Sequence, residues 1–84
     1  MTVRVEKGGP ILLEGSCSVD DAGSLLQFLT AIPSPTVDWR SCDWAHTAVI
    51  QILLASGVPL HGPPRGPLLR DVIEPLISRA AHPI

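Results

Sequence analysis

Residues 36–56 read Thr-Val-Asp-Trp-Arg-Ser-Cys-Asp-Trp-Ala-His-Thr-Ala-Val-Ile-Gln-Ile-Leu-Leu-Ala-Ser, and this stretch decides the fold. Residues 37–39 favour a β-strand, and residues 40–45, which include Arg40, Ser41 and Asp43, predict a turn that leads to a junction at 45–47. Residues 48–55 are apolar apart from Gln51 and contain no Gly or Pro, which predicts a helix. Such a helix has almost no polar face. We therefore expect a sheet on one side and other helices or a partner on the other to cover it.

The residues before this stretch begin with a predicted β-hairpin. Residues 3–6 alternate apolar and polar side chains, as in a half-exposed strand at a sheet edge. Lys-Gly-Gly-Pro at 7–10 favours a turn, and Ile-Leu-Leu-Glu at 11–14 forms the return strand. Because its apolar run is unbroken, we expect this second strand to be buried on both faces and to lie nearer the middle of the sheet.

A one-sided helix is predicted after the hairpin. Residues 15–18 lead into it, Ser18 is a suitable N-cap, and Asp20 and Asp21 stand where the helix dipole favours negative charge. Pro33-Ser34-Pro35 ends the helix. The apolar residues with helical spacing, which we expect to face the core, are Val19, Ala22, Leu25, Leu26, Leu29 and Ile32.

The residues after the apolar helix predict a short strand and a last helix. Gly57 suits a helix C-cap, and residues 58–60 form a brief edge strand because Pro59 lacks a ladder donor. Pro67 suits the first turn of the last helix, in which Pro75 predicts a kink or a break. The residues expected to face the core from this helix are Leu68, Leu69, Val72, Ile73, Leu76 and Ile77.

The predicted order is ββαβαβα, an α/β domain spanning residues 1–84 with a frayed tail at 80–84. Right-handed crossovers make the last three strands parallel and the first antiparallel to its neighbour. The result is a four-stranded mixed sheet with three helices.

Composition narrows the class of protein. The chain has 84 residues, a net charge of −2 and scattered basic residues, which argues against nucleic-acid binding. Its 45% hydrophobic content predicts an apolar patch that a partner or a second copy covers. Two cysteines are too few for a secreted disulfide framework, and no apolar run is long enough to cross a membrane. We expect a cytoplasmic protein with free thiols and no membrane association.

The strand, turn and helix start in residues 37–50 resemble the core segment of STAS domains, the small α/β modules typified by anti-sigma-factor antagonists. In that family a strand of the Leu-Asp-Leu type leads through Ser-Gly and an apolar residue to an Asp-Ser-Ser/Ala-Gly-Leu helix start. Aligned without a gap, 37–39 take the strand, 40–45 the turn and 46–50 the helix start. The predicted element order also agrees with the STAS core. The predicted order lacks the final strand and helix that family members usually add. The resemblance therefore implies a minimal version of the STAS domain.

Thr47 falls where phosphorylated STAS members carry the modifiable Ser. The acidic residues that flank this site in the family correspond to His46 and Ser18, and the family's helix-start Gly corresponds to Val49. Thr47 is therefore either a phosphorylation site or merely an N-cap or first-turn residue of the helix. The partner that the resemblance implies is a kinase-like anti-sigma factor or a component of a chemosensory or stress-signalling assembly in a bacterium.

The leading hypothesis is a non-catalytic signalling module, without metal or cofactor, that docks a protein around the start of the second helix. Trp39 should lie in the core, whereas Trp44 is the better interface anchor because Trp is enriched at interaction hot spots. The residues assigned to the partner-binding surface are Ser18, Asp43, Trp44, His46 and Thr47.

Two alternatives remain open. Cys42 and His46 have a Cys-x3-His spacing, and Cys17 ends a neighbouring strand, so the three could serve a metal-dependent or thiol enzyme. No third orienting group, Gly-rich phosphate loop or carboxylate pair supports catalysis. The other alternative is a structural homodimer in which the apolar second helix packs against its copy.

Overall fold

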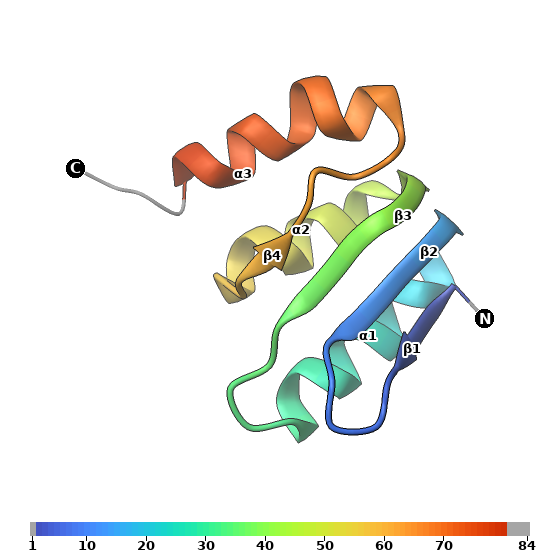
Figure 1. Ribbon diagram of the computed structural model, residues 1–84, viewed down its shortest axis with the longest axis vertical. Helices are drawn as coiled ribbons and strands as arrows, with labels where there is room; N and C mark the ends of the chain where they lie inside the picture. The colour runs from blue at the N-terminus through green and yellow to red at the C-terminus, as the bar shows by residue number, and fades with distance from the viewer. Residues whose placement is uncertain (1, 81–84) are drawn as a thin grey trace.

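The sheet follows the order of the chain. Within residues 2–80, which the computed structural model describes, it has four strands in the order β1-β2-β3-β4 (Figure 1). β1 (Val3–Val5) and β2 (Ile11–Cys17) form the antiparallel hairpin, and β3 (Val37–Ala45) and β4 (Leu60–His61) continue parallel to β2. The predicted α/β class, element order and strand directions are confirmed. The edge position predicted for β1 and for a short last strand is also confirmed, although β4 begins at Leu60 rather than at residue 58.

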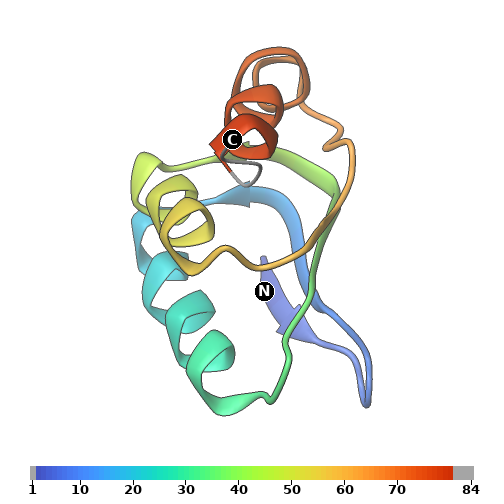
Figure 2. The ribbon, with the colours of Figure 1, turned by 90° about the vertical axis from the view of Figure 1, so that its left-hand side faces the viewer.

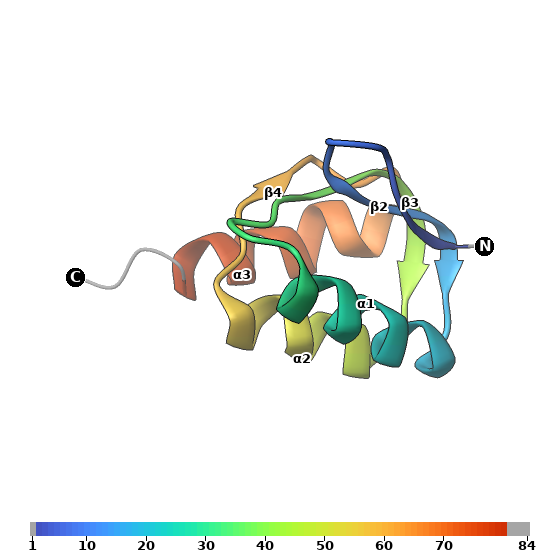
Figure 3. The ribbon, with the colours of Figure 1, turned by 90° about the horizontal axis from the view of Figure 1, so that it is seen from below.

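Two helices cover one face of the sheet. α1 (Val19–Ala31) and α2 (Thr47–Ser56) lie side by side there, as Figures 2 and 3 show from two directions. The last helix consists of a π-helical segment, η1 (Leu69–Ile73), followed by α3 (Glu74–Ala80), and lies at one end of the molecule. Residues 81–84, the rest of the predicted frayed tail, lie outside the described residues. No helix in the described part of the chain has the length and apolar character needed to cross a bilayer.

β2 and β3 are longer than the sequence pattern predicts. Residues 15–17 continue β2, and residues 40–45, predicted as a turn, continue β3 up to the start of α2. The pairing register shifts between Leu12 and Glu14 and again just after Gly15. Such irregularities break the two-residue alternation that marks a strand in a sequence. The predicted turn is therefore wrong, and both strands bend toward the helices instead (Figure 2).

The core lies between the sheet and the helices. Trp39 is fully buried, as predicted, and so are both cysteines. The buried apolar residues are Val3, Ile11, Leu13, Cys17, Ala22, Leu25, Val37, Trp39, Cys42, Ala45, Val49, Leu53, Val58, Leu69 and Ile77. On α1, however, Val19 and Leu26 are exposed and not in the core. α1 packs on one side only, so the apolar residues on its outer side have nothing to pack against.

α2 is less covered than its composition predicts. Val49 and Leu53 are buried, but Leu54 is 47% exposed. One face of this helix is exposed, and it carries Thr47, Gln51, Leu54 and Ala55. The expectation that α2 has no solvated face is therefore wrong. α1 lies along one side of α2 and α3 along another, and neither reaches its outer surface.

The last helix widens just before Pro75 but continues through it, so the break allowed by the sequence pattern does not occur. The chain becomes helical at Pro67, and the π segment comes directly before the α-helical turn that contains Pro75. The backbone N–H of Glu74 donates to the carbonyl of Leu69, five residues back, so the helix widens where Pro75 cannot donate. Three residues predicted to face the core are exposed instead: Leu68, Val72 and Leu76.

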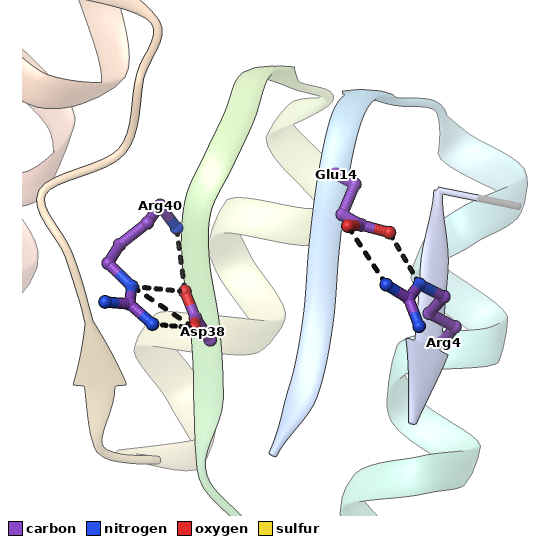
Figure 4. Close-up of polar contacts among 4 residues, drawn as sticks. All are labelled: Arg4, Glu14, Asp38 and Arg40. Atoms are coloured by element: carbon purple, nitrogen blue, oxygen red, sulfur yellow. Dashed lines mark hydrogen bonds and ion pairs between the residues drawn. The ribbon is translucent and has the colours of Figure 1, made fainter. Parts of the chain in front are cut away.

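The other face of the sheet is open and polar. Arg4 of β1 bonds Glu14 of β2, with Nε 2.7 Å from Oε1 (Figure 4). Asp38 bonds Arg40 on β3, with Nη2 2.7 Å from Oδ2. Leu12 is half-buried between them, which corrects the expectation that β2 is buried on both faces. The helices leave this face to solvent, so its strands carry charged pairs in place of apolar side chains.

Candidate functional site

The candidate site lies where β2 and β3 end and α1 and α2 begin. Cys17 and Ala45, the last residues of the two strands, pair directly in the ladder. The backbone N–H of His46 donates to the carbonyl of Cys17 at 2.9 Å, so Ser18 and His46 leave the sheet side by side. The carboxyl ends of parallel strands are where open α/β sheets present ligands. The structure thus brings the predicted residues of both helix starts to one end of the sheet.

His46 is the N-cap of α2. Its Nδ1 accepts a hydrogen bond from the backbone N–H of Ala48 at 3.0 Å. Because Nδ1 accepts this bond, it is the unprotonated ring nitrogen. Thr47 follows as the first residue of the helix and is exposed. Its side chain therefore stands at the positive end of the helix dipole, where an anionic group is stabilised.

Trp44 stands beside this cap. Its ring meets the His46 ring edge-on, with centroids 6.3 Å apart and planes at 87°. The indole is 46% exposed, so nearly half of a large apolar side chain faces solvent. Next to it is a mainly apolar groove of about 260 Å³ between α2 and η1, lined by Trp44, Ala45, Thr47, Ile50, Gln51, Leu68, Leu69 and Ile73. We call this the Trp44 groove.

Asp43 ties the groove to the loop before the last helix. Its carboxylate forms a two-pronged ion pair with Arg65, with distances of 2.6 and 2.8 Å. The hydrogen bond from Arg65 lowers the pKa of Asp43, and the carboxylate raises the pKa of the guanidinium in turn. The backbone N–H groups of Arg65 and Gly66 both donate to the carbonyl of Cys42 at 3.0 Å. These bonds fix the start of the last helix against β3, and with it one wall of the groove.

Ser18 has a structural role at the neighbouring helix. Its backbone N–H donates to Asp21 Oδ2 at 2.7 Å, and its hydroxyl donates to the same oxygen at 3.3 Å. Hydrogen bonds from Thr2 and Ser18 lower the pKa of Asp21. Ser18 therefore caps α1, as predicted, and it does not line the Trp44 groove.

The two cysteines meet in the core beneath the site. Both are free and fully buried, with Cys17 Sγ 3.9 Å from the carbonyl oxygen of Thr2 and Cys42 Sγ 3.4 Å from that of Trp44. The interaction of the two neighbouring thiols lowers the pKa of Cys17 and raises that of Cys42. Nδ1 of His46 is engaged in the cap of α2. Among residues 2–80, no three His, Cys, Asp or Glu side chains are grouped so as to hold a metal ion. The thiols are packed as small apolar side chains and are closed to solvent.

A second hollow, of about 550 Å³, lies at the opposite ends of α1 and α2. Its lining residues are Leu29, Ser34, Pro35, Thr36, Ser56, Gly57, Val58 and Pro59. None of these side chains titrates near neutral pH, so the lining offers no acid, base or thiol. The Trp44 groove has the large exposed aromatic side chain that this hollow lacks.

Sequence reasoning identified Trp44 and Thr47 but missed the far wall of the groove. The helical spacing predicts that Leu68, Leu69 and Ile73 face the core, but Leu68 is exposed at the rim of the groove. One signal could have found this wall. The last helix carries apolar residues on two neighbouring stripes, which is more than a single packing face requires.

The comparisons add no relatives. A scan of protein-family models gives no match, and searches of curated proteins and of solved structures give none either. The resemblance to STAS domains therefore rests on residues 37–50 and on the order of the elements.

Proposed function

We propose that this protein is a non-catalytic, STAS-like interaction module that docks a signalling partner at the Trp44 groove. The observation that carries the proposal is Trp44 itself, 46% exposed at the rim of an apolar groove. Trp is enriched among the residues that dominate binding energy at protein interfaces, and such residues cluster in pockets. The partner chemistry that fits is an apolar side chain that enters the groove, with polar groups that meet Thr47 and Gln51 at its edge.

The groove is rigid enough to serve as a docking site. Trp44 lies on β3, which is paired with β2 over most of its length. The opposite wall is held by the Asp43–Arg65 ion pair and by the bonds to the Cys42 carbonyl. A preformed site loses less conformational entropy on binding than a mobile one. By its resemblance, the partner is a kinase-like anti-sigma factor or a component of a chemosensory or stress-signalling assembly in the cytoplasm of a bacterium.

Thr47 is the candidate regulatory residue of this surface. It is exposed, begins α2 and lines the groove. A phosphoryl group there would lie at the positive end of the α2 dipole, which stabilises anions. It would also add roughly two negative charges at the rim of an apolar groove. Those charges would oppose the docking of an apolar side chain. We therefore propose that phosphorylation of Thr47 releases the partner.

Affinity capture from native cells tests the docking site. The wild-type chain, Trp44→Ala and the control Leu26→Ala are immobilised in parallel, and captured proteins are identified by mass spectrometry. Leu26 is a matched control because it is 51% exposed on α1, away from the groove. A protein retained by the wild type and the control but lost with Trp44→Ala supports the proposal. Equal retention on all three chains, or capture of nothing, overturns it. Circular dichroism confirms that both variants fold.

The same material tests the regulatory and enzymatic alternatives. A Thr47 peptide that carries one extra phosphoryl group in the unbound fraction, and not in the captured complex, supports the release mechanism. Titration of the native protein with a thiol reagent separates the module from a thiol enzyme. Both thiols should react only on unfolding, because Cys17 and Cys42 are fully buried. One rapidly reacting thiol, or stoichiometric zinc in the purified protein, would favour the enzyme.

A further inference from the structure

His46 caps α2 with a ring nitrogen that can take up a proton. Its Nδ1 accepts a hydrogen bond from the backbone N–H of Ala48 at 3.0 Å, so the bond requires an unprotonated Nδ1. The Asn or Ser oxygen that caps many helices accepts such a bond whether the solution is neutral or mildly acidic. Histidine, in contrast, is the side chain that changes its charge between about pH 5 and pH 8. The cap of α2 therefore exists only while the ring of His46 is neutral.

We infer that protonation of His46 releases the first turn of α2 and thereby weakens docking at the Trp44 groove. The proton taken up from solvent binds Nδ1, which then donates and no longer accepts. Rotation of the ring supplies no substitute, because both nitrogens of an imidazolium ion carry hydrogen. The new charge also stands at the positive end of the α2 dipole, where the first turn has no acidic residue to offset it. Both effects disfavour the helix start, so it is formed at neutral pH and released as the pH falls.

The helix start is part of the groove wall. Thr47, the residue that follows the cap, lines the groove together with Trp44. The His46 ring meets the Trp44 ring edge-on, with centroids 6.3 Å apart and planes at 87°. A ring that leaves the Ala48 N–H changes this contact as well, so the protonated form alters two neighbouring parts of one wall. The effect on docking rests on the function proposed above, whereas release of the first turn does not.

No carboxylate within residues 2–80 forms an ion pair with His46. Asp43 is paired with Arg65, and Asp21 accepts from the backbone N–H of Ser18 at 2.7 Å. The titratable groups on the elements that meet at this corner are Cys17 of β2, Asp20 and Asp21 of α1, Cys42 and Asp43 of β3, Arg65 of the loop that follows β4, and Arg70 and Asp71 of η1. The ring is half-buried and gains no counter-ion when it becomes charged, so the lost cap decides the direction of the effect.

Urea unfolding at about pH 8 and about pH 5 tests the release of the helix start. The wild type is compared with His46→Asn, which supplies an oxygen that does not titrate, and with the control His61→Asn. His61 is exposed on β4, so its replacement removes an imidazole that is not part of the cap. On acidification the unfolding equilibrium constant should rise about fivefold more for the wild type than for His46→Asn, as expected for the loss of one N-cap. His61→Asn should respond as the wild type does. Equal responses of the wild type and His46→Asn, or a response lost only in His61→Asn, overturn the inference.

Nuclear magnetic resonance of the wild type observes the same event at single residues. The amide proton of Ala48 should shift in step with the ring protons of His46 as the pH falls. The amide proton of Leu53, which lies later in the same helix, should shift little. An Ala48 amide that does not follow His46 overturns the inference, whether or not a partner is known.

Affinity capture from native cells at the same two pH values tests the effect on docking. The wild type and His61→Asn should each retain several-fold less partner at about pH 5 than at about pH 8, and His46→Asn should lose less. Equal loss from all three chains overturns the control of docking by His46. Capture of no partner at either pH contradicts the function proposed above, and the resonance measurement then decides the release of α2 by itself.

Discussion

The imidazole of His46 holds the first turn of α2 through a single bond, from the backbone N–H of Ala48 to Nδ1 at 3.0 Å. The position is one that Asn, Asp, Ser or Thr fills in most helices, because a short side-chain oxygen reaches the same N–H. The ring also meets Trp44 edge-on at 6.3 Å. One side chain therefore connects the geometry of the helix start to the aromatic wall of the groove.

Removing this cap should destabilise the protein. His46→Ala leaves the N–H of Ala48 without its acceptor, and loss of an N-cap typically costs about 1 kcal/mol. His46→Asn supplies a side-chain oxygen and should retain most of the stability. Urea unfolding followed by circular dichroism measures both. If the alanine and asparagine variants unfold at the same urea concentration, the bond to Nδ1 does not contribute.

Gly66 should tolerate no side chain. A Cβ at this position would overlap the carbonyl group of Asp43, because the loop before the last helix packs directly on β3. Backbone must then move, and the bond from the Gly66 N–H to the Cys42 carbonyl, at 3.0 Å, is strained or lost. Gly66→Ala should therefore cost about 1–3 kcal/mol and loosen the last helix. Hydrogen exchange of residues 67–77 reports the loosening directly.

Gly23 provides the matched comparison. It lies inside α1, and a Cβ there meets nothing within 4 Å. Gly23→Ala should stabilise the protein by up to about 1 kcal/mol, because Gly is the poorer helix former. In thermal melts, Gly23→Ala should raise the melting temperature and Gly66→Ala should lower it. A stabilised Gly66→Ala variant would mean that the loop does not contact β3 as the structure shows.

The contrast between α1 and β3 shows what the sequence could predict. α1 has a cap, acidic residues in its first turn, helical spacing and a terminating Pro-Ser-Pro, and the observed helix matches the predicted bounds closely. β3 has a register irregularity that moves its buried residues from every second position to every third, at Trp39, Cys42 and Ala45. Local periodicity cannot reveal a strand whose alternation depends on how its neighbour is paired.

The candidate site was predictable in part for the same reason. Trp44 and Thr47 are adjacent in sequence to the helix start, so the junction itself identified them. The wall formed by Leu68 and Ile73 comes from a helix that is distant in sequence, and its position depends on the ion pair between Asp43 and Arg65. Apolar periodicity shows that such a helix packs somewhere, but it does not show which of its apolar stripes faces the core.

Acid should unfold the protein partly through Asp38. Hydrogen bonds from Arg40 lower the pKa of this carboxyl group in the folded state. A carboxyl group whose pKa is lowered by folding stabilises the folded state. This stabilisation is fully present above the pKa of the group in the unfolded chain, about 3.9, and is lost as the pH falls through its pKa in the folded protein. Stability should therefore decline below about pH 4.

Two variants isolate this contribution. Asp38→Asn should lower the free energy of unfolding at neutral pH by about 1 kcal/mol, because hydrogen bonds to a charged group are stronger than those to a neutral one. The variant should also lose less stability than the wild type when the pH is lowered. Asp71→Asn should have a smaller effect, since 61% of the Asp71 side chain is exposed against 13% for Asp38. Thermal melts between neutral and acidic pH measure both variants. If the wild type and Asp38→Asn lose the same amount of stability at acidic pH, the Asp38 carboxylate does not contribute to acid unfolding.

A negative charge at Thr47 should stabilise α2. The first turn of this helix contains no acidic residue, so nothing at present offsets the positive end of its dipole. Thr47→Glu should raise the free energy of unfolding by about 0.5 kcal/mol at low salt, and added salt should reduce the gain. Ala55→Glu, an exposed position in the last turn of the same helix, should do the opposite. If both changes shift stability in the same direction, the dipole does not explain the effect. If Thr47→Glu stabilises the fold but also releases the partner captured by the wild type, the charge acts at the docking surface and not by unfolding it. That combination of results is what phosphorylation of Thr47 as a release signal requires.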